Sequence, residues 1–172
     1  MKMIDALLAE LEQEAQTTRR QLERIPEEHL TWKPHPKSMS LGQLALHIAT
    51  VPGNVAELAA RDVVPEPSTF QQPEALTTAE LVPALTDSVA RAKRALGAFD
   101  DTKMQATWRL QNDGKDLLAM PRVAFVRAIM LNHWYHHRGQ LQVYLRLLNV
   151  PVPSVYGPTA DENPFVAQAV HA

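Results

Sequence analysis

The stretch Asn132-His-Trp-Tyr-His-His-Arg-Gly-Gln140 decides the fold, and it places two histidines four residues apart. Four residues make about one turn of an α-helix, so His133 and His137 point in nearly the same direction. With His133 at 0° and about 100° per residue, His137 lies at about 40°. Several neutral nitrogen donors at about 2 Å are what a divalent metal ion requires, so this spacing indicates a metal site.

The helix face that carries these histidines is otherwise apolar. It contains Val126, Met130, Trp134, Leu141, Tyr144 and Leu148, all between about 20° and 100° on the same wheel. A ring nitrogen in an apolar stripe needs a partner, because an unsatisfied buried polar group is costly. His136 falls near 300°, at the boundary of the stripe, and is expected to flank the site.

A third histidine, His47, borders an apolar stripe on an earlier predicted helix. That stripe contains Leu44, Ile48, Val51, Val55 and Leu58. If the two helices are neighbours in a bundle, His47, His133 and His137 complete a three-nitrogen metal site. The alternative is three core histidines that bond backbone carbonyls or buried waters.

Composition and charge exclude several classes of protein. The 172 residues suit one domain, residues 1–172, and 45% apolar with 21% charged residues is ordinary for a globular chain. The formal net charge of −2, without long charged runs, argues against binding to nucleic acid. The absence of cysteine excludes disulfides and thiolate ligands. No signal peptide and no apolar run of about 20 residues is found, so we expect a cytoplasmic protein without a membrane span.

Apolar periodicity predicts four long helices. Their expected ranges are Ile4–Ile25, Ser40–Ala60, Thr77–Phe99 and Pro121–Asn149. Ser40 with Gln43, and Thr77 with Glu80, have the spacing of capping boxes. Pro52 lies inside the second helix and is expected to kink it or to remove one hydrogen bond.

The segments between these helices carry little strand pattern. Residues 27–39 are expected to form an ordered loop, and residues 62–72 a polar surface crossover. Residues 101–120 contain the turn signal Asn112-Asp-Gly114 and either pair as a hairpin or stay irregular. The tail, residues 151–172, is expected to lie across the surface or to fray. We therefore predict an all-α four-helix bundle with irregular connections and a C-terminal tail.

Several motifs resemble one known family. Leu30-Thr-Trp-Lys-Pro34, Met39-Ser-Leu-Gly-Gln-Leu-Ala-Leu-His47-Ile48 and His133-x-x-x-His137-Arg-Gly-Gln140 are similar to the DinB and YfiT-like superfamily, and Pro153–Asp161 resembles one DinB branch. The resemblance implies a four-helix bundle, a homodimer and one divalent metal on His47, His133 and His137. The family name refers to induction by DNA damage and implies no binding to DNA.

The resemblance also implies a range of activities. Better understood relatives resemble metal-dependent transferases that use a low-molecular-weight thiol such as bacillithiol or mycothiol. Three protein nitrogens leave a coordination position open, where a metal can activate water for hydrolysis or bind a thiol as a nucleophilic thiolate. All-nitrogen ligation suits zinc, nickel, iron or copper, of which we expect zinc or nickel.

We therefore expect a metal-dependent enzyme that acts on a small molecule, with thiol S-transferase-like or hydrolase-like activity. The alternatives are a non-catalytic dimeric metal-binding or stress-response protein and, third, a metal-free bundle with core histidines. A cleft that opens on the metal would favour the enzyme, and a metal sealed under side chains would not.

Residues around the predicted site offer weaker signals. Gln43 and Asn54 share the helix face of His47, and Gln140 shares that of His133, so each can orient a ring or simply be polar at the bundle edge. Arg138 falls near 140°, off the metal face, which predicts an interface or a salt bridge. Glu57, at about 280° from His47, is the nearest carboxylate, so no general base and no catalytic residue is assigned.

Overall fold

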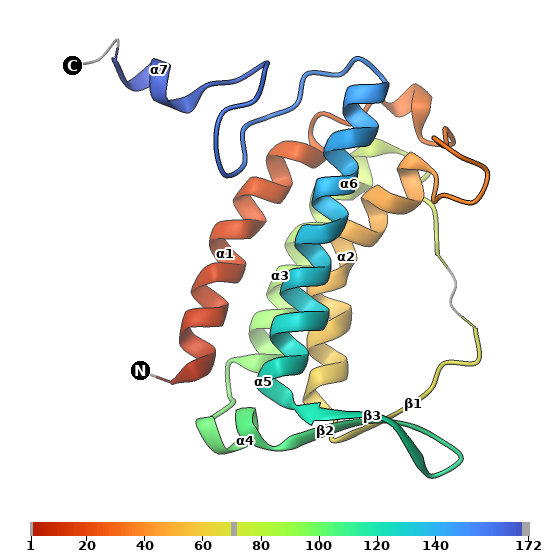
Figure 1. Cartoon of the computed structure of the whole chain (residues 1–172), viewed down its shortest axis with the longest axis vertical. Helices are drawn as coiled ribbons and strands as arrows, with labels where there is room; N and C mark the ends of the chain where they lie inside the picture. The colour runs from red at the N-terminus through yellow and green to blue at the C-terminus, as the bar shows by residue number, and fades with distance from the viewer. Residues whose placement is uncertain (1, 70–71, 170–172) are drawn as a thin grey trace.

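Four long helical segments dominate the computed structural model, which describes residues 2–69 and 72–169. They pack side by side (Figure 1) and are α1 (Met3–Leu22), α2 (Leu41–Ala60), α3 (Leu81–Leu96) and a last segment made of α5 (Arg122–Phe125), η3 (Val126–Asn132) and α6 (His133–Leu147). Each begins and ends within a few residues of the predicted range. In the described part of the chain, no helix is long and apolar enough to cross a membrane.

A small sheet at one end of the helices corrects the prediction of an all-α fold. Its strands are β1 (Val63–Pro65), β2 (Thr107–Asn112) and β3 (Lys115–Pro121), in the order β1-β2-β3, with β1 parallel and β3 antiparallel to β2 (Figure 1). Asp113 (φ 49°) and Gly114 (φ 76°) both have positive φ, as a tight type I′ hairpin turn requires. The turn signal therefore makes a hairpin, and β1 occupies the start of the predicted crossover.

Four short helices complete the described elements: η1 (Glu27–His29), η2 (Thr78–Glu80), α4 (Asp101–Gln105) and α7 (Pro164–Ala169). The helix α7 lies within the tail that was expected to be irregular from residue 151. Before α7 the tail is bound to the bundle, because Asp161 pairs with Arg146 of α6 at 2.5 Å and Glu162 pairs with Arg20 of α1. Residues 170–172 of the tail lie outside the described part.

The capping box predicted at the start of α2 is present. The Gln43 N–H donates to Ser40 Oγ at 3.1 Å, and the Ser40 N–H donates to Gln43 Oε1 at 3.0 Å. These bonds satisfy two backbone donors that the first turn would leave free. They fix where α2 begins, and with it the position of His47 two turns along.

The helix α2 runs through Pro52 because a neighbouring helix supplies the missing hydrogen bond. Pro52 has no N–H to donate to the Ile48 carbonyl. The indole Nε1 of Trp134 donates to that carbonyl at 2.8 Å instead. Trp134 follows His133 directly, so this bond holds α6 against α2 at the level of the histidines.

The helix α3 also forms hydrogen bonds with the part of α2 around Pro52. The Gly53 N–H donates to Ser88 Oγ at 2.8 Å, and the Ser88 hydroxyl donates to the Thr50 carbonyl at 3.0 Å. A Cβ added at Gly53 would lie 2.8 Å from the Ser88 carbonyl, so glycine permits this close approach of α2 and α3.

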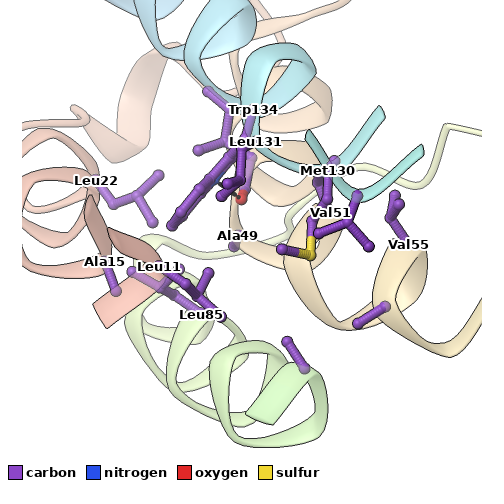
Figure 2. Close-up of a cluster of buried hydrophobic side chains, with 14 of the residues drawn as sticks. Leu11, Ala15, Leu22, Ala49, Val51, Val55, Leu85, Met130, Leu131 and Trp134 are labelled. Carbon is purple, nitrogen blue, oxygen red and sulfur yellow. Dashed lines mark hydrogen bonds between the residues drawn. The ribbon is translucent and has the colours of Figure 1, made fainter. Parts of the chain in front are cut away.

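The core lies between the long helices (Figure 2). Leu11, Ala15 and Leu22 of α1 meet Ala49, Val51 and Val55 of α2, Leu85 of α3, and Met130, Leu131 and Trp134. Most of the stripe predicted beside the histidines is buried: Val126, Met130, Trp134 and Leu141 are fully enclosed, whereas Tyr144 and Leu148 are partly buried.

One part of the last helix differs from the prediction of a regular helix from Pro121 to Asn149. The segment η3 is a π-helix of seven residues, with hydrogen bonds from residue i to i+5. It ends at Asn132, so the α-helical geometry assumed for His133 and His137 holds from His133 onwards. Single-turn π segments are frequent beside functional sites, and this one directly precedes the histidines.

Candidate metal centre

The structure brings His47 of α2 together with His133 and His137 of α6. One nitrogen atom from each ring lies within 4.8 Å of the other two. The Nε2 atoms of His47 and His133 are 3.1 Å apart. His136 is exposed and does not join this group, as the wheel predicted.

These separations suit a single metal ion. In tetrahedral zinc sites the metal–nitrogen bonds are about 2.0–2.1 Å, so two nitrogen ligands lie about 3.4 Å apart. The 3.1 Å between His47 and His133 is close to that value, and the nitrogen of His137 lies within 4.8 Å of both. Three neutral imidazoles without a carboxylate suit a borderline divalent ion such as zinc or nickel.

Burial keeps the three imidazoles neutral. It lowers the pKa of His47 from its ordinary value of 6.5 to about 4, with smaller contributions from any charge on His137 and His133. Burial is also the main cause that lowers the pKa of His133 and of His137. A metal binds the neutral ring, so near pH 7 the site presents three free donors.

The histidine group is not sealed from solvent. His137 is only 8% exposed, but His47 and His133 are half-buried. The group therefore lies near the surface of the bundle, and the cleft opening on the metal that would favour an enzyme stays a prediction.

Gln140 orients one of the rings. Nδ1 of His137 lies 2.7 Å from Gln140 Oε1, three residues further along α6. An amide oxygen only accepts, so Nδ1 carries the proton and Nε2 is left with its lone pair free for a metal. The sequence placed Gln140 on the face of His133, whereas its contact is with His137.

The Gln140→Leu variant is expected to bind zinc about ten- to a hundredfold more weakly than the wild type, because partners that orient metal-ligating histidines typically contribute that much. A competition titration against a chromophoric chelator measures the affinity. Gln16→Leu, an exposed substitution on α1, is the matched control. Equal affinities for Gln140→Leu and the wild type would contradict this role.

The other residues predicted as partners of His47 contact other groups instead. Gln43 caps α2 and donates from Nε2 to the Gln72 carbonyl at 3.2 Å. Asn54 Oδ1 accepts from Arg91 at 3.0 Å, and Glu57 forms an ion pair with the same Arg91 at 3.0 Å. None of these three residues has a hydrogen bond to His47. The carboxylate of Glu57 is engaged by Arg91, which argues against Glu57 as a general base.

Arg138 forms a salt bridge, as predicted, but a deeply buried one. It is 2% exposed and pairs with Glu14 of α1 at 2.5 Å. It also donates to the Thr18 hydroxyl at 3.2 Å and to the Tyr156 hydroxyl of the tail. Glu14 and Tyr156 were not singled out from the sequence, because no local pattern links residues so far apart. This cluster fixes α6 against α1 on the side opposite α2.

The lowered pKa of His47 predicts how the metal-free protein responds to acid. Between about pH 6.5 and pH 4 the unfolded chain binds the proton more readily than the folded chain does. Stability is therefore expected to fall as the pH falls through this range, and this contribution levels off below about pH 4. Urea unfolding at a series of pH values measures it, and His47→Gln should show a shallower fall. The same slope in both proteins would contradict the prediction.

Comparison with known proteins identifies the family to which these features correspond. The model of the DinB family matches residues 1–164, which include all three histidines. The uncharacterized protein YrdA of Bacillus subtilis is 27% identical over 169 residues, covering 92% of this chain and 91% of YrdA.

Solved structures share the fold. A DinB-like protein from Bacillus cereus has a TM-score of 0.69 at 24% identity and covers 89% of this chain and 97% of its own. The DinB-like protein YjoA of Bacillus subtilis has a TM-score of 0.65 at 21% identity, covering 92% and 99%. These likenesses concern the arrangement of the helices and the sheet, and they assign no activity.

Proposed function

This chain belongs to the DinB family, and from that premise and its three converging histidines we propose that it is a metal-dependent enzyme acting on a small molecule. His47, His133 and His137 would hold one zinc or nickel ion. The observation that carries the proposal is the convergence of one nitrogen from each ring, all within 4.8 Å of one another, with two of the three rings only half-buried.

Thiol S-transfer is the reaction that we propose first. When bound, a divalent ion lowers the pKa of a coordinated thiol or water. A thiol ionised in this way is a nucleophile and needs no separate base. Hydrolysis would gain from a general base, but Glu57, the carboxylate that the sequence placed nearest, is paired with Arg91. The proposed cosubstrate is therefore a low-molecular-weight thiol.

The residues of the chain have distinct parts in this proposal. The three imidazoles would bind the metal as neutral donors, and Gln140 orients His137 by accepting a hydrogen bond from its Nδ1–H. Trp134 bonds the Ile48 carbonyl and so holds the two ligand-bearing helices together. Homodimerisation remains a prediction from the family resemblance.

Spectroscopy of the cobalt-substituted protein tests the proposal. Addition of bacillithiol, mycothiol or glutathione is expected to produce a near-ultraviolet charge-transfer band with at least one of them, because a thiolate then ligates the metal. His137→Ala should show no such band. A metal-loaded wild type that gives no band with any of these thiols would contradict thiol transfer. If that protein hydrolysed model esters or amides, hydrolysis would replace thiol transfer as the proposed reaction. A protein with neither activity would support the non-catalytic alternative.

A further inference from the structure

An apolar cavity of about 590 Å³ lies between the sheet and the helices α2 and α5–η3. Its wall includes Leu58 of α2, Trp108 of β2, Leu118 of β3, Phe125 of α5 and Ile129 of η3. The charged residues on its wall, Arg61 and Glu66, are exposed. The volume falls within the range of small-molecule sites, about 300–1,000 Å³.

The wall of the cavity is held rigidly on one side. Trp108 is 3% exposed, its ring stacks on Phe125 with centroids 3.8 Å apart, and its Nε1 donates to the Leu58 carbonyl at 3.0 Å. Each of these three residues lines the cavity. The cavity is therefore formed before any ligand arrives, which lowers the entropic cost of binding.

The open side of the cavity leaves apolar side chains in water. Leu118 is 38% exposed and Ile129 is 36% exposed. Their transfer out of water is favourable, so an apolar ligand gains from contact with them.

The cavity and the histidine group lie on the same two helical segments, α2 and the last segment made of α5, η3 and α6. Ile129 precedes His133 by four residues, which is about one helical turn. Leu58 follows His47 by eleven residues, about three turns, so both lie on the same face of α2. The edge of the cavity at Ile129 is therefore its nearest approach along the chain to the histidine group.

We propose that this cavity binds the apolar acyl or aryl part of the substrate, while the reactive group lies at the histidine site. The assignment of the two parts to one substrate rests on the proposed function. The concave shape favours a small molecule over a second copy of the chain, since a ligand of that size can be enclosed by a preformed cleft between helix and sheet.

Hydroxamates of different chain length test this inference, because acetohydroxamate reports on the metal alone and octanohydroxamate adds an alkyl chain. Calorimetric titration of the zinc-loaded protein is expected to show tighter binding of octanohydroxamate, by about three- to fourfold for each methylene that enters the cavity. A change in the tryptophan emission spectrum gives a second readout, since Trp108 lines the wall.

Two adjacent residues of β3 supply matched variants. Leu118 lines the cavity, whereas Leu117, which is 51% exposed and has no partner in the register with β2, does not. Leu118→Asp should remove the gain from the longer chain and leave acetohydroxamate affinity unchanged. Leu117→Asp should leave both affinities unchanged.

The outcomes separate this inference from the proposed function. If the protein holds no zinc, the proposed function fails, and octanohydroxamate titrated into the metal-free protein still tests the cavity through Leu118→Asp. Equal affinities for the two hydroxamates, or a gain that survives Leu118→Asp, would overturn the inference. A dimer that dissociates only in Leu118→Asp, with no chain-length gain in the wild type, would assign the cavity to a subunit interface and overturn it as well.

Discussion

Replacement of Arg138 by alanine is expected to lower the free energy of unfolding by about 3–5 kcal/mol, because it leaves the carboxylate of Glu14 buried without its partner. Glu14 is 6% exposed and Arg138 is 2% exposed, so both charges are largely removed from water. In the wild type, Arg138 and the Tyr156 hydroxyl both donate to the Glu14 carboxylate. Without Arg138, only the Tyr156 hydroxyl of this cluster still donates to it, at 2.9 Å. For a chain of this size the loss corresponds to a fall in Tm of about 10 °C.

Two further variants show whether the burial of the pair causes the effect. Lys93→Ala removes an exposed ion pair with Glu12 and should cost about 1 kcal/mol or less. The double variant Glu14→Gln with Arg138→Met removes both charges and should recover much of the stability that Arg138→Ala loses. Urea unfolding measures all of them. Arg138→Ala with the stability of Lys93→Ala would show that the buried pair is not important for the fold.

Zinc is expected to raise the Tm of the wild type and not that of His137→Ala. A ligand that binds only the folded state at a hundred times its Kd stabilises by about 2.7 kcal/mol, which corresponds to about 5–10 °C for a domain of this size. His137 supplies one of three donors, so its removal leaves two nitrogens on different helices and a much weaker site.

His136→Ala is the matched control for this prediction. The two histidines are adjacent in the sequence, but His136 is exposed and lies outside the group. The shift in Tm with zinc should therefore be the same in His136→Ala as in the wild type. If His136→Ala lost the shift and His137→Ala kept it, the orientation assigned to α6 would be wrong.

The histidine group could be predicted from the sequence because its geometry is mostly local. His133 and His137 are one turn apart, and the apolar residues around them set the direction in which that turn faces. His47 followed from the same reasoning on a second helix, once the two helices were assumed to be neighbours. The helical wheel predicted the wrong histidine partner for Gln140. It compares residues by angle alone, so it did not distinguish His137, three residues away, from His133, seven residues away.

The sheet could not be predicted with the same argument. The strand β1 has three residues and pairs with β2, more than forty residues away, so no local signal marks it. In β3 nearly all side chains are exposed, which removes the alternation of apolar and polar residues that reveals a half-buried strand. Only the turn at Asp113 and Gly114, where φ must be positive, was visible in the sequence.

The buried cluster on the other side of α6 was only partly predictable. Arg138 was placed off the metal face by its angle, but its partners come from α1 and from the tail. The cavity beside the sheet could not be predicted from the sequence either, because it forms where α2, η3 and the unpredicted strands meet.

Measurement of metal content tests the central claim most directly. The wild type, purified without a histidine tag and dialysed after incubation with zinc or nickel, is expected to retain about one equivalent of metal per chain by elemental analysis. His47→Ala, which changes only the donor from α2, is expected to retain almost none, because all three histidines belong to one site. Equal metal content in the two proteins, or no metal in the wild type, would contradict the account.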